Sequence, residues 1–195
     1  MHSMRDFFDR HSPAWDSYQR PFDYDAVGVI IDRIAPGPED RVLDVGCGTG
    51  ILVEPLQKKG VRDYLGLDIS AGMATVFRSK YPELSFIIGD FAQASIKCAS
   101  RSRVIIFNAF PHFPDEAEVF AQAFRILIPG GTLTIAHSMN REALDEHHRH
   151  AGIAVQDHVL IADDAFHRLY GEAGFTNVTV ENSTLFYSSG RKPSV

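Results

Sequence analysis

Cysteine is scarce in this sequence, since Cys47 and Cys98 are the only two among 195 residues. Two cysteines are too few for a disulfide framework, and these two lie too far apart for a short zinc-binding motif. Their number and spacing favour reduced thiols in a cytoplasmic protein.

Positive charge is also in the minority, because 19 Lys and Arg stand against 25 Asp and Glu, which gives a formal net charge of -6. Such a chain has no electrostatic bias toward nucleic acid or an anionic membrane surface. No apolar run approaches the roughly 20 residues of a membrane-spanning helix, and residues 1–10 lack the apolar stretch of a signal peptide. We therefore expect a cytoplasmic protein with no membrane and no nucleic-acid partner. The charge is compatible with a small-molecule or a protein substrate, and we predict a small molecule.

What is present is the composition of an ordinary globular domain, with 45% hydrophobic and 23% charged residues. Short β-rich runs alternate with runs whose apolar residues have helical spacing. This alternation predicts a parallel sheet with helices on both faces, and two late β runs predict an antiparallel hairpin at its edge. We predict a doubly wound α/β fold with a seven-stranded, mostly parallel sheet. The expected strands are 41–45, 64–68, 84–88, 104–108, 131–137, 176–181 and 185–188.

The rest of the chain is predicted to surround this domain. Residues 1–38 are expected to form a helical arm or lid, and residues 39–188 the sheet-containing domain. An insert at about 138–162, which includes a helix over about 141–150, is expected beside the ligand. Residues 189–195 are polar and contain Gly190 and Pro193, and we predict a flexible tail there.

A glycine-rich run follows the first predicted strand. In a sheet of this kind ligands bind beyond the carboxyl ends of the strands. The run from Val42 to Gly50 has the spacing G-x-G-x-G, and glycines there bring the backbone close to a ligand. Asp44, two residues before the first of these glycines, can accept a hydrogen bond from an amino group, whereas a pyrophosphate is best served by bare amides. A tight turn without a ligand is the alternative.

This run resembles motif I of the class I S-adenosylmethionine (SAM)-dependent methyltransferases, and the resemblance extends from about Phe7 to Phe186. It implies a Rossmann-like methyltransferase fold with SAM as the cofactor. Residues 8–18 are similar to the arm that covers SAM in small-molecule members, which include the quinone-biosynthesis methyltransferases. Tyr18 or Trp15 would then shield the methionine end of SAM, although simple packing of an N-terminal helix explains them equally well.

The resemblance also assigns roles to residues that follow the strands. Asp68 would bind both ribose hydroxyls, and a carboxylate can accept two hydrogen bonds side by side. Asp90 would accept a hydrogen bond from the adenine amino group, between apolar walls formed by Ile69 and Phe91. For both acids, capping of a neighbouring turn or helix is the alternative. The full expected cofactor-binding set is Asp44, Gly46, Cys47, Gly48, Asp68, Ile69, Asp90, Phe91, Asn108 and Tyr18.

Methyl transfer from a sulfonium is an in-line displacement, which requires alignment and a general base if the acceptor carries a proton. His112, after the fourth strand, and His137, at the end of the fifth, are the candidate catalytic residues. Ordinary packing histidines are the alternative. We predict no metal site, because no H-E-x-x-H or C-x-x-C spacing is present. A speculative metal set of imidazoles would comprise His112, His137, His147 and His148.

Three other functions remain open at this point. An NAD(P)-dependent oxidoreductase would share the glycine run, but the G-x-G-x-G spacing and the lack of an obvious Tyr-Lys pair disfavour it. A non-catalytic SAM-binding protein would keep the same cofactor motif. Metal-linked activity through the histidines is a minor alternative.

Overall fold

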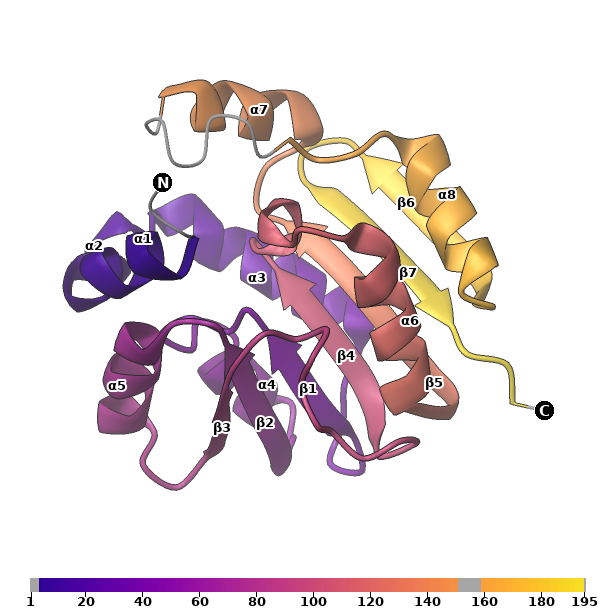
Figure 1. Cartoon of the computed structure of the whole chain (residues 1–195), viewed down its shortest axis with the longest axis horizontal. Coiled ribbons are helices and arrows are strands. Elements are labelled where there is room, and N and C mark those ends of the chain that lie inside the picture. The colour runs from indigo at the N-terminus through magenta and orange to yellow at the C-terminus, as the bar shows by residue number, and fades with distance from the viewer. Residues whose placement is uncertain (1–3, 151–158, 195) are drawn as a thin grey trace.

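The computed structural model describes residues 4–150 and 159–194, and its centre is a twisted sheet with helices on both faces (Figure 1). The seven strands have the order β3-β2-β1-β4-β5-β7-β6. The first five are parallel, whereas β7 is antiparallel to both β5 and β6. This confirms the predicted α/β fold and its C-terminal hairpin. The strands are β1 (Arg41–Val45), β2 (Asp63–Asp68), β3 (Ser85–Ile88), β4 (Arg101–Phe107), β5 (Leu127–His137), β6 (Thr176–Asn182) and β7 (Phe186–Arg191).

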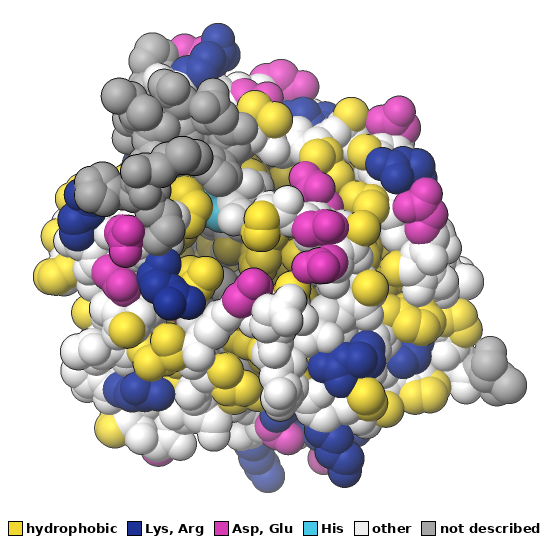
Figure 2. Space-filling view, in the orientation of Figure 1, with side chains coloured by type: hydrophobic (Ala, Val, Ile, Leu, Met, Phe, Trp, Pro, Cys, Tyr) yellow, Lys and Arg dark blue, Asp and Glu magenta, His cyan; other side chains and the backbone are white. Residues whose placement is uncertain are grey.

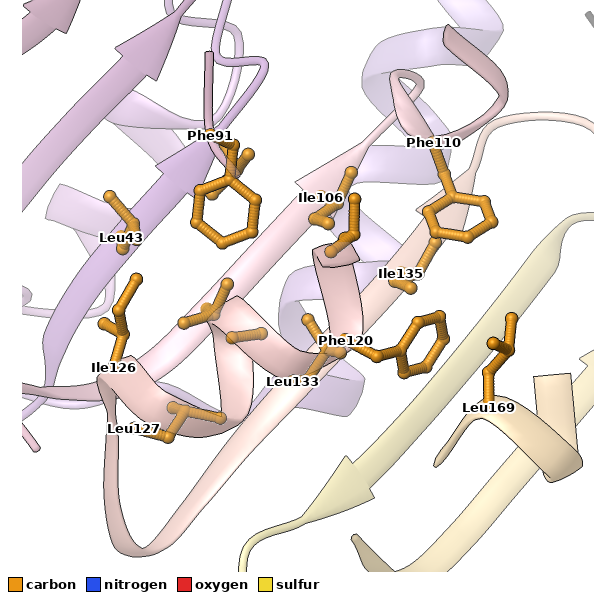
Figure 3. Close-up of a cluster of buried hydrophobic side chains, with 14 of the residues drawn as sticks. Leu43, Phe91, Ile106, Phe110, Phe120, Ile126, Leu127, Leu133, Ile135 and Leu169 are labelled. Atoms are coloured by element: carbon orange, nitrogen blue, oxygen red, sulfur yellow. The ribbon is translucent and has the colours of Figure 1, made fainter. Parts of the chain in front are cut away.

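Alternate residues of each strand point to opposite faces of the sheet, and this divides the core into two clusters. Val42 packs with the helices on one face, α3 (Pro21–Ile34), α4 (Val53–Lys58) and α5 (Ala71–Lys80). Leu43 packs on the other face with α6 (Glu116–Ile126) and α8 (Asp163–Glu172). Figure 3 shows part of this second cluster, where Phe120 of α6 lies among strand side chains. Phe120 is fully buried, which contributes roughly 1.5–3 kcal/mol to folding.

The N-terminal segment, residues 4–20, packs against α5 and against the turn after β1. It consists of α1 (Met4–His11), the 3₁₀ turn η1 (Ser12–Ala14) and α2 (Trp15–Tyr18). Asp9 accepts hydrogen bonds from the Ser70 hydroxyl at 2.5 Å and from the Gly72 N–H at 2.9 Å. Asp16 accepts one from the Thr49 hydroxyl at 2.5 Å. Two carboxylates therefore fasten this segment to the domain.

Several boundaries differ from the prediction: β5 begins at Leu127 instead of residue 131, and β7 ends at Arg191 instead of residue 188. The flexible tail predicted for 189–195 is wrong for residues 189–191, because β7 continues to Arg191 and pairs with β5. The physical reason is that Gly190 serves close packing rather than flexibility. A Cβ atom at Gly190 would lie 2.5 Å from the ring of Tyr170 in α8. Beyond the strand, the Lys192 ammonium donates to the carbonyls of Phe124 and Leu127.

The predicted insert contains α7 (Arg141–His150), at the position expected for a helix. The remaining part of that prediction falls largely on residues 151–158, which lie outside the described residues. No helix in the described ranges is both long and apolar enough to cross a membrane.

Candidate functional site

A cavity of about 330 Å³ lies at the carboxyl ends of the parallel strands. This edge includes the point between β1 and β4 where the order of the strands reverses, and ligands bind there in open α/β sheets. The cavity is lined by the turn after β1, the ends of β2 and β3, the segments after β4 and β5, the N-terminal segment and α7. On the face shown in Figure 2, acidic and basic side chains are interspersed around apolar ones, so this face is not a uniformly basic surface.

The turn after β1, which we call the glycine loop (residues 46–50), forms one wall of the cavity. Gly46 has φ +69°, and a Cβ atom there would lie 2.5 Å from the Cβ atom of Ala109. Gly48 has φ +53°, and a Cβ atom there would lie 3.6 Å from Nε1 of Trp15. Glycine at Gly46 therefore lets the loop approach the segment after β4, and Trp15 covers the loop at Gly48. Gly46, Cys47 and Gly48 all line the cavity.

Asp68, at the end of β2, links the glycine loop to the start of α5. One carboxylate oxygen accepts a hydrogen bond from the Gly48 N–H, and the other accepts one from the Ser70 N–H, both at 2.9 Å. The residue is 8% exposed, and burial raises the pKa of its carboxyl group. A carboxylate has about four lone-pair positions. Asp68 thus retains acceptor capacity for a ligand hydroxyl within the cavity that it lines.

Three more predicted residues line the cavity farther along the sheet edge, namely Ile69, Asp90 and Phe91. One oxygen of Asp90 accepts a hydrogen bond from the Ala92 N–H at 3.0 Å, which holds the turn after β3. Phe91 is 1% exposed, and it also belongs to the apolar cluster of Figure 3. These side chains offer an acceptor beside an apolar surface, which suits a flat heterocycle with an amino group.

Asn108 follows β4 and has the left-handed conformation, with φ +52°. Its side-chain oxygen accepts a hydrogen bond from the Ser138 N–H at 2.9 Å, and its amide group donates to the Ser138 hydroxyl at 3.2 Å. These two bonds tie the ends of β4 and β5 together. Asn108 and Ser138 both line the cavity.

Asp44 is placed differently from the prediction. It is not among the described residues that line the cavity, and its carboxylate accepts a hydrogen bond from the Tyr64 hydroxyl at 2.8 Å. Burial raises the pKa of Asp44 to about 7; the Tyr64 hydrogen bond lowers it, and the negative charge of Asp68 raises it further. Direct contact between Asp44 and a ligand amino group is therefore not what this geometry favours.

The two aromatic candidates of the N-terminal segment differ in position. Trp15 lies over Gly48, as described above, whereas Tyr18 is 58% exposed, although both line the cavity. The centroids of their rings are 6.2 Å apart. Trp15 is thus the aromatic residue placed to cover a ligand on the glycine loop.

Sequence reasoning missed Asp23, a buried carboxylate in the first turn of α3. It accepts hydrogen bonds from the Ser138 hydroxyl at 2.6 Å and from the Arg20 N–H at 2.8 Å, and it lines the cavity. An acid in the first turn of a helix is a recognisable capping signal. That signal does not tell which side of the helix end faces a cavity, because the direction depends on how α3 packs on the sheet.

Three histidines line the cavity on the side of α7, namely His112 of η2 (Phe110–His112), His137 at the end of β5, and His147 of α7. His137 is 1% exposed, and the ring of His112 makes an edge contact with Phe8, with centroids 5.4 Å apart. No group of three His, Cys, Asp or Glu residues within the described ranges is placed to hold a metal ion. The side chain of His148, the fourth member of the speculative metal set, lies outside the described residues.

Comparisons with known proteins bear on this site. Residues 42–131 match a family model described as a methyltransferase domain. A demethylmenaquinone methyltransferase from Renibacterium salmoninarum is 32% identical over 108 residues, which are 55% of this chain and 45% of that protein. The chain spans about half the length of the first curated relatives that it matches.

Solved structures share the fold at lower identity. A methyltransferase from Haloferax volcanii, in complex with the methyltransferase activator Trm112, has a TM-score of 0.82 at 22% identity. The match covers 98% of this chain and 100% of the Haloferax chain. Phosphoethanolamine N-methyltransferase 2 from Haemonchus contortus, in complex with phosphomonomethylethanolamine and S-adenosylhomocysteine, has a TM-score of 0.80 at 17% identity. The match covers 99% of this chain and 61% of the Haemonchus contortus protein. The family match confirms the methyltransferase resemblance over residues 42–131, and the solved structures show the same fold.

Proposed function

Because residues 42–131 form a methyltransferase domain of the class I, SAM-dependent type, we propose that this protein transfers a methyl group from SAM to a small-molecule acceptor. One observation carries the proposal. One cavity is lined by the glycine loop, Asp68 and Asp90 and also by His112 and His137. The proposed cofactor site and a candidate base thus share one cavity.

The residues present fit SAM as the bound cofactor. Asp68 is a buried carboxylate that lines the cavity, and the glycines Gly46 and Gly48 of the loop beside it line the cavity without side chains. In the proposed mode Asp68 binds the ribose hydroxyls, Asp90 binds the adenine amino group, and Ile69 and Phe91 flank the ring. When bound, SAM supplies a methyl group that is already activated on a sulfonium.

The chain then has to align the acceptor, remove its proton and keep water out. We propose that His112 acts as the general base that removes the acceptor's proton. His112 is half-buried and can pass the proton on to solvent, whereas the buried His137 contacts the acceptor. Trp15 and Phe8 of the N-terminal segment cover the cavity, and we propose that this segment excludes water from the reaction. The acidic net charge and the names of the relatives, which include a demethylmenaquinone and a phosphoethanolamine methyltransferase, support a small-molecule acceptor.

The test is transfer of a labelled methyl group from SAM to a panel of phenols, quinols and amines. With an acceptor that the wild type methylates, His112→Gln is expected to lower the rate by about 10² to 10⁴, as loss of a general base does. Its affinity for S-adenosylhomocysteine, measured by calorimetry, is expected to stay unchanged. His167→Gln, on the exposed face of α8, is the matched control and should leave both quantities unchanged.

Three outcomes separate the alternatives. An unchanged rate in His112→Gln would remove the histidine from the base role. Binding of S-adenosylhomocysteine without transfer to any acceptor would favour a non-catalytic SAM-binding protein. Binding of NADH in place of SAM would overturn the proposed function as a whole.

A further inference from the structure

We propose that Tyr64 is a positioning residue for the cofactor, whose hydroxyl group holds Asp44 as a carboxylate beneath the glycine loop. The inference rests on the proposed function, because it concerns the binding of SAM. It starts from the placement of Asp44, which is not among the described residues that line the cavity and accepts a hydrogen bond from Tyr64 of the neighbouring strand.

The geometry of the pair is well defined. Tyr64 is the second residue of β2 and is paired in register with Val42 of β1, so its ring reaches diagonally along β1 to Asp44. Its hydroxyl group donates to the Asp44 carboxylate at 2.8 Å. Both residues are buried, at 6% and 2% exposed. The Tyr64 ring is nearly parallel to that of Phe77 in α5, with centroids 6.0 Å apart, which fixes its orientation.

The other groups that face Asp44 are apolar or acidic, and its side-chain hydrogen-bond donor is the Tyr64 hydroxyl. Across the other side of β1, the residue in register with Asp44 is Ile105 of β4, which is apolar. The remaining titratable groups that interact with this pair are the Cys47 thiol and the Asp68 carboxylate, and both are acidic. Neither supplies a positive charge to offset a buried carboxylate.

The charge of Asp44 matters because of what lies above it. Gly46 and Cys47, the second and third residues after Asp44, form part of the cavity wall. SAM and S-adenosylhomocysteine both carry an ammonium group, and charges interact strongly across a poorly solvated wall. An ionised Asp44 therefore stabilises the bound cofactor, and a protonated one does not.

The direction of the pH dependence follows from this. Burial raises the pKa of Asp44 to about 7, even with the Tyr64 hydrogen bond that lowers it. Binding of the cationic cofactor favours the ionised form, so affinity should rise with pH through that pKa and level off above it. Without the hydroxyl group the pKa of Asp44 rises, and the increase in affinity should move to higher pH.

The experiment uses the full chain with Tyr64→Phe, which keeps the ring packed on Phe77 and removes only the hydroxyl group. S-adenosylhomocysteine is titrated calorimetrically between pH 6 and 9. The midpoint of the affinity profile is expected to move up by about one pH unit, with roughly fivefold weaker binding near pH 7, nearly tenfold weaker binding near pH 6 and near-normal binding at pH 9. Tyr170→Phe is the matched control, since that buried hydroxyl bonds to Ser188 far from the cavity, and it should leave the profile unchanged.

A variant at position 44 separates the titration of Asp44 from the titration of the cavity histidines. In the Asp44→Asn variant, the Tyr64→Phe substitution should no longer move the profile, because no carboxyl group remains to titrate at that position. Carbon NMR of the Asp44 carboxyl group should show its titration at higher pH in Tyr64→Phe than in the wild type. Equal weakening at every pH, or a shift that persists with Asn at position 44, would overturn the inference while the cofactor site stands. A wild type that binds no S-adenosylhomocysteine would overturn the proposed function and this inference together.

Discussion

The conformation of the glycine loop depends on glycine at position 46, and replacing this residue should change the free energy of unfolding. Gly46 combines a positive φ with a Cβ position that Ala109 already occupies. Gly28, in the middle of α3, has neither constraint, because no neighbouring atom lies within 4 Å of its Cβ position. Glycine is therefore required by the local geometry at Gly46, whereas at Gly28 only helix propensity distinguishes glycine from alanine.

We predict opposite effects of alanine at these two positions on the free energy of unfolding, measured by urea denaturation. Gly46→Ala should lower it by at least about 2 kcal/mol, because of the left-handed backbone and the close contact. Gly28→Ala should raise it by roughly 0.5–1 kcal/mol, since alanine favours a helix more than glycine does. Equal stability of Gly46→Ala and the wild type would mean that the loop is not held in the conformation described here.

The positions of some residues in and around the cavity were predictable from the sequence, and those of others were not. Asp68 and Gly48 follow directly from the order of strands and turns. The side-chain directions of Asp44, Tyr64 and Asp23 were not predictable from the sequence. They depend on packing between strands and helices that lie apart in the sequence. Tyr64 looked like an ordinary strand residue, and only the register of β1 and β2 shows that it reaches Asp44.

At the scale of elements, the N-terminal segment is held by a small number of polar contacts. Asp9 of α1 lies at the start of α5, where backbone N–H groups and the helix dipole favour a carboxylate. The Ser70 hydroxyl and the Gly72 N–H lower the pKa of Asp9 below its usual value. Trp15, the only tryptophan in the sequence, belongs to the same segment and reports on its position.

We predict that Asp9→Ala loosens this segment and increases acrylamide quenching of Trp15 fluorescence at pH 7, with little change in the melting temperature of the domain. Asp25→Ala, on the exposed side of α3, is the control and should leave the quenching unchanged. Because the pKa of Asp9 is lowered on folding, its contribution is complete above pH 3.8 and is lost as the pH falls through the lowered value. The quenching of wild type and Asp9→Ala should therefore converge in acid, and a difference that persists there would argue against the carboxylate contact.

Most strands and helices were predictable, because their apolar spacing and the flanking glycines and prolines are local signals. The C-terminal end of β7 was not. A glycine in a polar segment normally indicates a turn or a fraying end, but Gly190 accommodates the Tyr170 ring. The sequence contains no local signal for a contact between α8 and β7, so the strand was predicted too short.

At the scale of the whole molecule, the sheet brings together groups that are widely separated in the sequence. Residues from Phe8 to His147 line one cavity because all five parallel strands end at the same edge. The N-terminal segment covers the glycine loop, and the histidines lie after β4, at the end of β5 and on α7. The proposed cofactor site and the proposed acceptor site thus share one cavity, and a change at Asp68 tests the cofactor site without altering the histidines.

Calorimetric titration of S-adenosylhomocysteine into the wild type, Asp68→Ala and Asp63→Ala tests the proposed cofactor site most directly. Asp63 lies at the opposite end of β2, where its side chain is 52% exposed, and serves as the control. We predict that Asp68→Ala weakens binding by at least about 100-fold, because it loses two hydrogen bonds to a charged acceptor. Asp63→Ala should bind as the wild type does. Binding in Asp68→Ala that equals the wild type, or no binding in any of the three proteins, would contradict the cofactor site described here.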